Sequence, residues 1–201
     1  MPRCGGLYES RATLVLLPET LVNQWQKEVE KFAPPGMTVH VFVGTEASPA
    51  AQAMQLLRLA LADVVVTTYN TVRGEFYKVG STDRSRRHAV RFEVPLSALR
   101  RMRWWRVCLD EAQEVKSSVT KAAEMARQLE AVNRWCVTGT PIGTGGIQDV
   151  GGLLHFLRHE PLGNRRVWAN VAAKWAVAPQ MAFLEAALKP MVCVIHALCQ
   201  H

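Results

Sequence analysis

The sequence predicts an α/β fold, in which helices flank a mostly parallel sheet. Short apolar runs rich in valine and leucine alternate along the chain with longer stretches of helical spacing, and proline or glycine separates several of them. Strands that alternate with helices form βαβ units, whose strands lie parallel in one sheet. With 201 residues and 49% hydrophobic content, the chain can build one substantial core.

The start of the chain predicts a strand followed by a helix. Residues 1–11 are polar and are predicted as a linker before a strand at residues 12–17, which Pro18 ends. Thr20 is predicted to cap the helix, because threonine accepts hydrogen bonds from free N–H groups at a helix start. Apolar residues then recur at helical spacing, so one helix face, including Trp25, is predicted to be buried. This face comprises Val22, Trp25, Val29 and Phe32.

The remaining elements follow from the same patterns. Residues 74–93 are rich in arginine and poor in apolar side chains, and are predicted as a long exposed insertion. A charged loop and a nucleic-acid contact are both consistent with that insertion. Alternation in the strand that follows predicts that Arg103 and Trp104 point to opposite faces. Predicted strands lie at residues 39–43, 63–68, 104–109 and 134–138, and predicted helices at 50–62, 118–129, 148–157 and beyond 165, with Trp168 and Trp175 in the core.

Two adjacent carboxylates, Asp110 and Glu111, follow directly after the apolar and aromatic run from Trp104 to Leu109. Open parallel sheets bind their ligands at the carboxyl ends of the strands. One acid can hold Mg²⁺, usually through water, and the other can polarise a nucleophilic water molecule. Acids also end many strands because turns and helix N-caps favour them, so the pair alone does not distinguish a site from an ordinary turn.

Further sequence blocks stand on both sides of this pair. T-L-V-L-L-P-E-T-L-V-N-Q-W-Q-K-E (Thr13 to Glu28) and D-V-V-V-T-T-Y (Asp63 to Tyr69) precede it. R-W-C-V-T-G-T-P-I (Arg134 to Ile142) and D-V-G-G-L-L-H-F-L (Asp149 to Leu157) follow it. With L-D-E-A-Q between them, residues 12–160 resemble the first motor lobe of Swi/Snf-type, superfamily-two helicase-like ATPases. The W-W-R-V-C-L-D-E-A-Q strand and the K-A-A-E-M-A helix resemble most closely the SNF/PHD/RING helicase-type E3 ubiquitin ligases. Several blocks in one order are more specific than any single block.

The resemblance implies a RecA-like lobe and a role for each acid. Asp110 would hold Mg²⁺ through water, and Glu111 would orient or activate the water that attacks the γ-phosphate of ATP. Gln113 stands where histidine is commoner and can still form hydrogen bonds. Residues 161–201 would be a helical extension of the lobe.

The resemblance also implies a coupling motif and a nucleic-acid face. Hydroxyls of the T-G-T turn can bond Glu111 or Gln113 directly, although threonine in an ordinary turn also satisfies its own backbone. This turn comprises Thr138, Gly139 and Thr140. The segments that would line the nucleic-acid face contribute Pro18, Thr20, Gln24, Thr67, Thr68 and Tyr69. Their hydroxyls and the free N–H groups of a helix start would read the phosphate backbone rather than the base sequence.

The nucleotide-binding parts are incomplete in this sequence. No Gly-Lys-Ser or Gly-Lys-Thr triplet occurs, so we expect the phosphate loop and its strand to lie N-terminal to Met1. The parent protein would also need a second RecA-like lobe, and the isolated chain is predicted to be inactive. The resemblance further implies a nuclear location, ATP and Mg²⁺ as cofactors of the parent, and double-stranded DNA or chromatin as its partner, with possible links to the ubiquitin machinery.

Charge and cysteine content are consistent with these expectations. The net charge of +7 suits a polyanion, nucleic acid before membrane, and no apolar run is long enough to span a bilayer. The five cysteines form no C-x-x-C pair, which indicates a reducing compartment and no RING module. Cys193, His196, Cys199 and His201 are zinc-type ligands, but they are crowded more closely than structural zinc sites usually are. A non-catalytic nucleic-acid or protein-binding module and an unrelated flavodoxin-like domain remain as alternatives.

Overall fold

The structure is a computed structural model, and its described residues divide into two compact units that we treat separately. The described residues are 3–4, 6–80, 97–115, 121–140 and 146–177. The first unit comprises Met1–Leu109 with Glu124–Trp135, and the second comprises Asp110–Ala123 with Cys136–His201. Among the described residues, no helix has the length and apolar character needed to cross a membrane.

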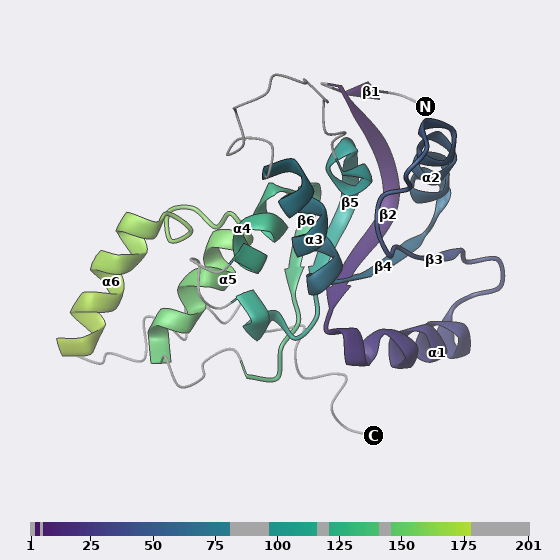
Figure 1. The fold of residues 1–201 in the computed structure, drawn as a ribbon. Coiled ribbons are helices and arrows are strands. Elements are labelled where there is room, and N and C mark those ends of the chain that lie inside the picture. The colour runs from purple at the N-terminus through teal and green to yellow at the C-terminus, as the bar shows by residue number, and fades with distance from the viewer. Residues whose placement is uncertain (1–2, 5, 81–96, 116–120, 141–145, 178–201) are drawn as a thin grey trace, which may run out of the picture. The chain divides into compact units, whose positions relative to one another are not determined.

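A sheet with the strand order β3-β4-β2-β5-β6 forms the centre of the first unit (Figure 1). Strands β2 and β4, β2 and β5, and β3 and β4 pair in parallel, while the short β1 pairs antiparallel with β2. The strands are β1 (Arg3–Cys4), β2 (Leu7–Leu17), β3 (Val39–Val41), β4 (Val64–Thr68), β5 (Met102–Leu109) and β6 (Glu130–Cys136). The predicted mostly parallel sheet is therefore confirmed.

The register of the central strands brings their carboxyl ends to one edge of the sheet. Leu17, the last residue of β2, pairs with Thr68 at the end of β4. Leu16 pairs with Leu109, the last residue of β5. The residues that follow these strands therefore leave the sheet from the same edge, which is where parallel sheets bind their ligands.

The middle strands are buried along most of their length. Leu14, Leu16 and Leu17 of β2 are fully enclosed, which explains the uninterrupted apolar run in the sequence. Trp104 of β5 is also fully buried, and its indole Nε1 donates to the Leu99 carbonyl at 3.2 Å. Its neighbour Arg103 is exposed, so the predicted alternation of these two residues is confirmed.

Helices connect the strands and cover the sheet. Pro49 begins α2, and the Ser48 side chain accepts from the Ala51 N–H at 3.2 Å, so this helix has a proline start and a side-chain cap. The Ser10 hydroxyl of β2 donates to the Leu59 carbonyl of α2 at 3.0 Å and fixes the helix on the sheet. The helices are α1 (Val22–Phe32), α2 (Pro49–Leu61), α3 (Tyr69–Gly80), α4 (Lys121–Gln128), α5 (Val150–Phe156) and α6 (Arg165–Val177).

The beginning of the chain differs from the prediction in two ways. Strand β2 begins at Leu7, so residues 7–11 belong to the sheet and are not a linker. Thr20 does not cap a helix, because it lies within the 3-10 turn Glu19–Leu21, whose Leu21 N–H donates to the Pro18 carbonyl at 3.0 Å. The α-helix starts one residue later than predicted, with Leu21 at its N-cap and no side-chain cap.

The predicted buried face of α1 is also wrong. None of its residues is buried, Val22, Trp25 and Val29 are half-buried, and Phe32 is 70% exposed. Apolar residues at helical spacing indicate that a helix has an apolar side. The spacing does not predict how far the rest of the molecule buries that side.

Helix α3 directly follows β4 and replaces the first part of the predicted insertion, residues 74–80. Tyr69 is its first residue, and the Thr68 hydroxyl accepts from the Thr71 N–H at 3.0 Å in the manner of a cap. Glu75, within the stretch predicted to be exposed, is buried and accepts from the Thr45 N–H at 3.1 Å. The arginine-rich remainder, residues 81–96, lies outside the described residues.

The second half of the first unit shows one shifted element. Strand β6 spans Glu130–Cys136 rather than residues 134–138, so Thr138 lies beyond the strand. The predicted helix at 118–129 is observed as α4, and residues 116–120 before it lie outside the described part.

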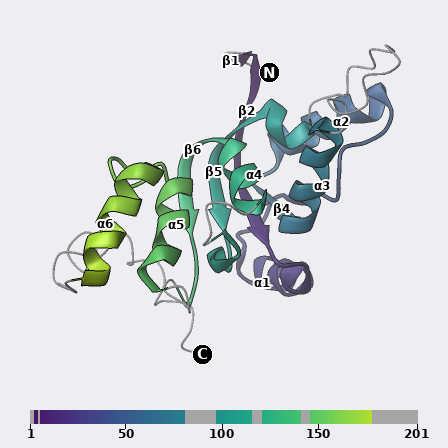
Figure 2. The same ribbon diagram turned by 60° about the vertical axis from the view of Figure 1, so that its left-hand side comes forward.

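Helices α5 and α6 pack together in the second unit (Figure 2). Val150 and Leu154 of α5 and Trp168 and Ala172 of α6 form a buried cluster, which confirms Trp168 as a core residue. Gly151 allows close contact, because a Cβ atom there would lie 2.3 Å from Trp168 Cδ1. The Trp175 side chain and the zinc-type residues near the C-terminus lie outside the described part.

Candidate functional site

The acid pair predicted from the sequence occupies a turn that a backbone hydrogen bond joins to the segment after β6. Asp110 and Glu111 follow β5 directly, and both are half-buried. The Ala112 N–H donates to the Val137 carbonyl at 2.9 Å. This bond holds the acid turn against the segment that carries the T-G-T bend, and all of these residues belong to the second unit.

Glu111 has a backbone conformation that non-glycine residues rarely adopt. Its φ angle is +49°, in the left-handed region. The Glu111 N–H donates to Asp110 Oδ1 at 3.0 Å, and the Glu111 carbonyl accepts from the Glu114 N–H at 3.0 Å. Such strained residues persist where the surroundings over-determine them, and they cluster at functional sites.

A chain of side-chain hydrogen bonds connects the T-G-T bend to Glu111. The Thr138 hydroxyl accepts from the Thr140 N–H at 3.2 Å and donates to Gln113 Oε1 at 2.5 Å. Gln113 Nε2 in turn donates to Glu111 Oε2 at 2.6 Å. We call these four residues, Glu111, Gln113, Thr138 and Thr140, the carboxylate relay. Every donor in it points toward the Glu111 carboxylate, so the relay fixes the orientation of that side chain.

The relay confirms one geometric prediction. A hydroxyl of the T-G-T bend was expected to bond Glu111 or Gln113, and Thr138 bonds Gln113. Thr138 is 2% exposed, so its hydroxyl depends on this partner, whereas Gly139 and Thr140 are exposed. The catalytic and coupling roles of these residues remain predictions.

The carboxylate oxygens at the acid turn are suitable ligands for a hard cation. Mg²⁺ prefers oxygen ligands, keeps several water molecules and usually binds only one or two protein carboxylates. Asp110 and Glu111 present two adjacent carboxylates of this kind. Within the described residues, no group of three or more His, Cys, Asp and Glu side chains could hold a metal. A cage made only of protein ligands is therefore not seen in that part of the chain, and a water-rich site fits better.

The residues predicted for the nucleic-acid face lie at the ends of β2 and β4 in the first unit. Thr20 and Gln24 are exposed, and Pro18 is half-buried. Pro18 and Tyr69 directly follow the paired residues Leu17 and Thr68, so the register brings the two segments together.

The two threonines that end β4 are less available to a ligand than the sequence suggested. Thr67 is fully buried, and its hydroxyl donates to the Phe42 carbonyl at 2.9 Å. The Thr68 hydroxyl bonds the Thr71 hydroxyl at 2.9 Å, and Tyr69 is buried. Thr67 and Thr68 therefore support the fold, and Thr20 and Gln24 are the better candidates for contacting a ligand.

Sequence reasoning missed a buried polar network in the first unit. Both carboxylate oxygens of Glu75 accept from Thr45, one from its N–H and one from its hydroxyl. The Thr45 hydroxyl also accepts from the Ala98 N–H at 3.1 Å. These bonds connect the loop after β3 with α3 and with the segment before β5. No local signal identifies Glu75, because its hydrogen-bond partner Thr45 lies 30 positions away in the sequence.

Comparison with known proteins shows the family. The model of the SNF2-related domain matches residues 6–200. The chain is 36% identical over 169 residues to the E3 ubiquitin-protein ligase SHPRH of Homo sapiens, covering 81% of this chain and 10% of that protein. It is 35% identical over 170 residues to the DNA repair protein RAD5A of Arabidopsis thaliana, covering 84% and 15%.

A third relative is named for its use of ATP. An uncharacterized ATP-dependent helicase of Schizosaccharomyces pombe is 30% identical over 176 residues, covering 83% of this chain and 16% of that protein. The chain thus spans between 10% and 16% of the length of these three relatives.

A solved structure shows the same fold. The Sulfolobus solfataricus SWI2/SNF2 ATPase core in complex with double-stranded DNA matches 90% of this chain with a TM-score of 0.64 and 24% identity, over 32% of its own length. The predicted RecA-like architecture is therefore confirmed at the level of the fold. Taken with the family model and the relatives above, the chain belongs to the SNF2-related domain family.

Proposed function

We propose that this chain forms part of the first RecA-like lobe of an ATP-driven translocase on double-stranded DNA. The carboxylate relay is the observation that carries this proposal. The relay connects two segments that such a motor must couple. One carries the acids that would act at the nucleotide, and the other is the T-G-T bend, which would couple the nucleotide site to DNA. The Gln113 amide, which accepts from Thr138 and donates to Glu111, is the physical link between them.

The two acids have different roles in this proposal. Asp110 would hold Mg²⁺ through water, and Glu111 would orient the attacking water and accept its proton. The Gln113 N–H that donates to Glu111 Oε2 leaves Oε1 of the same carboxylate for that water. When bound, Mg²⁺ neutralises phosphate charge. The left-handed backbone of Glu111 and its bond from Gln113 hold the carboxylate in one orientation before the substrate arrives.

The complete motor would need parts that this sequence lacks. A phosphate loop with a Gly-Lys-Thr or Gly-Lys-Ser triplet would hold the ATP phosphates, and a second lobe would complete the site. We therefore expect no ATP turnover from the 201-residue chain alone. We also propose a nuclear location and a parent protein that works on chromatin. Two of the relatives are named as a ubiquitin-protein ligase and a DNA repair protein, and they support this context.

A chimera tests the role of Glu111. This chain replaces the matching segment of the Schizosaccharomyces pombe relative, and ATP hydrolysis is measured with and without double-stranded DNA. We expect the chimera to hydrolyse ATP and Glu111→Gln to lower kcat about a hundredfold or more, because a neutral amide cannot accept the proton of the attacking water. Binding of a fluorescent ATP analogue should remain, since Glu111 acts on the water and not on the nucleotide.

Glu114→Gln is the matched control for that experiment. Glu114 lies in the same turn, is exposed, and its backbone N–H donates to the Glu111 carbonyl. Its substitution should leave kcat within about twofold. Equal turnover of the Glu111→Gln and unsubstituted chimeras would contradict the proposed role. A folded but inactive unsubstituted chimera would contradict the proposed function itself.

A further inference from the structure

Helix α2 presents an apolar seam to solvent on the side opposite its buried face. Gln55, Leu56 and Leu59 point inward and are buried. The opposite side carries Ala50, Met54, Leu57 and Leu61, which we call the α2 seam. Their spacing of four, three and four residues is the heptad spacing by which one helix packs along another.

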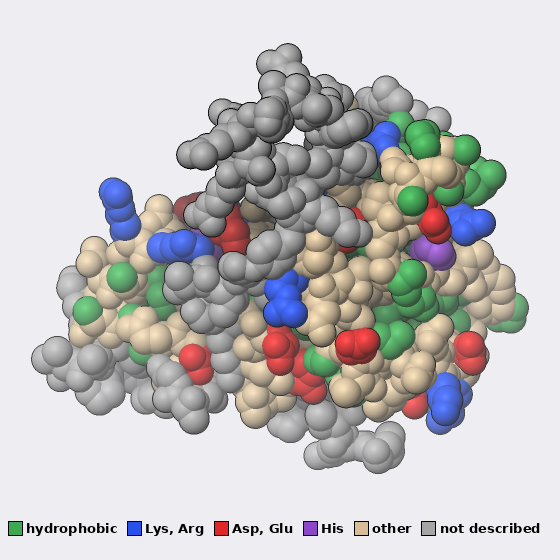
Figure 3. All heavy atoms as spheres, in the orientation of Figure 1, with side chains coloured by type: hydrophobic (Ala, Val, Ile, Leu, Met, Phe, Trp, Pro, Cys, Tyr) green, Lys and Arg blue, Asp and Glu red, His purple; other side chains and the backbone are tan. Residues whose placement is uncertain are grey.

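The α2 seam is exposed to an unusual degree for large apolar side chains. Met54 is 52% exposed, Leu57 39% and Leu61 69%. Figure 3 shows hydrophobic side chains gathered over α2, at the upper right of the view. A single exposed leucine is ordinary, but a contiguous row at helical spacing is typical of a binding surface.

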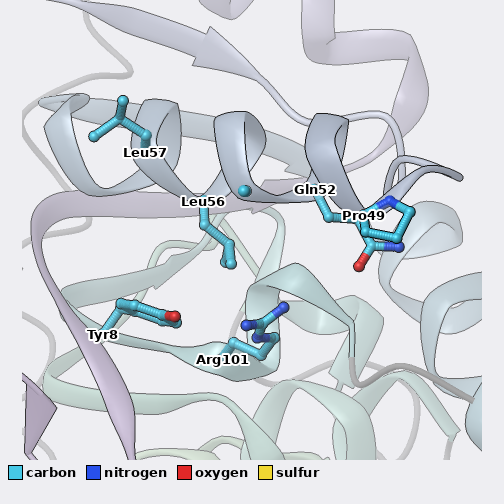
Figure 4. A pocket seen from close by; sticks show the side chains of 7 residues that line it. Tyr8, Pro49, Gln52, Leu56, Leu57 and Arg101 are labelled. Atoms are coloured by element: carbon cyan, nitrogen blue, oxygen red, sulfur yellow. The ribbon is translucent and has the colours of Figure 1, made fainter. Parts of the chain in front are cut away.

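A groove adjoins the α2 seam, and Leu57 belongs to both. The groove has a volume of about 490 Å³ and is lined by Tyr8, Pro49, Gln52, Ala53, Leu56, Leu57 and Arg101. Figure 4 shows Leu56 pointing from α2 toward Tyr8 and Arg101. The Arg101 guanidinium lies 5.6 Å from the centre of the Tyr8 ring.

The positive charges beside the α2 seam favour a partner with acidic side chains. Arg58 is exposed beside Leu57 and Leu61, and Arg101 lies in the groove. Neither arginine forms an ion pair with a described carboxylate, and α2 itself contains no Asp or Glu. Arg58 is the one charged residue within α2, so two copies of α2 packed on each other would have no carboxylate in either helix to pair with it. A helix with acidic flanks would complement both arginines.

We propose that the α2 seam and its groove bind an acidic amphipathic helix of a partner protein. The apolar side chains of that helix pack on Met54, Leu57 and Leu61, and its carboxylates face Arg58 and Arg101. This is the helix-on-helix mode of recognition, with anchors at heptad spacing. The proposal does not depend on the nucleotide chemistry, because α2 belongs to the first unit and the carboxylate relay to the second.

Two designed peptides test the proposal on the full 201-residue chain. One is a helix with leucine at the heptad core positions and glutamate at the flanking positions, and the other has lysine in place of glutamate. Fluorescence anisotropy should show saturable binding of the glutamate peptide only. Leu57→Asp should weaken that binding about tenfold or more, because it places a charge in the apolar seam. Arg58→Glu should weaken it about threefold and allow the lysine peptide to bind.

Val43→Asp is the matched control for Leu57→Asp. Val43 is 83% exposed and lies outside the α2 seam, so this variant should bind the glutamate peptide as the unsubstituted chain does. Circular dichroism establishes that each variant is folded. Equal affinities of Leu57→Asp and Val43→Asp would overturn the proposal, and so would an unchanged peptide preference in Arg58→Glu. Self-association that Met54→Glu abolishes would assign the α2 seam to a second copy instead.

Discussion

At the scale of single residues, hydrogen bonds to carboxylates explain the local geometry. Glu111 adopts a left-handed φ, and the bond from Gln113 holds its side chain. In the first unit, the Asp63 carboxylate is likewise held by hydrogen bonds. Its Oδ2 accepts from both the N–H and the hydroxyl of Thr38, each at 2.8 Å. The Thr38 N–H first, and its hydroxyl second, lower the pKa of Asp63 below its ordinary value of 3.8.

The lowered pKa of Asp63 predicts how stability depends on pH. The folded state binds this proton less readily than the unfolded chain, so the stabilisation exists above about pH 4 and is lost as the pH falls through the folded-state pKa. Asp63→Asn should therefore lower the melting temperature at pH 7, and this difference from the unsubstituted chain should shrink at pH 3. Thermal denaturation followed by circular dichroism measures both.

Glu30→Gln is the control for that comparison, because Glu30 is an exposed carboxylate on α1. It should change the melting temperature little at either pH. A difference between Asp63→Asn and the unsubstituted chain that stays constant from pH 7 to pH 3 would contradict a charge-dependent contribution.

At the scale of elements, the sequence predicted kinds of structure better than their bounds. Strands β4 and β5 were located within two residues, because valines dominate the buried part of β4 and the buried end of β5, Val107–Leu109, is a continuous apolar run. Helix α3 was missed because its buried Glu75 is satisfied by Thr45, far away in the sequence. The cap at Thr20 was wrong because a 3-10 turn precedes α1.

Two glycines in helices give an opposed pair of predictions at this scale. Gly151→Ala should destabilise the chain by about 1–3 kcal/mol, because its Cβ would lie 2.3 Å from Trp168 Cδ1 in a packed contact. Gly74→Ala should stabilise it by about 0.5–1 kcal/mol, since no atom lies within 4 Å of that Cβ and alanine favours a helix. Urea denaturation measures both free energies of unfolding. A Gly151→Ala variant as stable as the unsubstituted chain would contradict the packing of α5 on α6.

At the scale of the whole molecule, the fold and family could be predicted because several blocks follow one another in one order. The acids, the T-G-T bend and the strand ends are each short, but their sequence order specifies the lobe. The hydrogen bond of Thr138 to Gln113 was predictable as a possibility, and its geometry was not. The α2 seam could not be predicted, because apolar spacing in a helix does not reveal which side the sheet covers.

The basic character of the chain gives a prediction about DNA binding that the motor lobe shares with a non-catalytic binding module, and ATP turnover of the chimera separates the two. With a net charge of +7, the chain should bind double-stranded DNA with an affinity that falls as salt rises. Asp110→Asn and Glu111→Gln should leave this affinity unchanged, because these acids act on the nucleotide. Fluorescence anisotropy at several salt concentrations measures it. Salt-independent binding would contradict contacts to the phosphate backbone, and no ATP turnover in the chimera would favour the binding module.

Coupling through the carboxylate relay is the central claim, and Thr138→Val in the chimera tests it most directly. The substitution removes the hydroxyl that donates to Gln113 and keeps the side-chain shape. DNA stimulation of ATP turnover should fall about tenfold, since leaving the half-buried Gln113 acceptor unsatisfied costs about 1 kcal/mol, while Thr138→Ser should retain the stimulation. Equal stimulation by DNA in the valine and serine variants would contradict the claim.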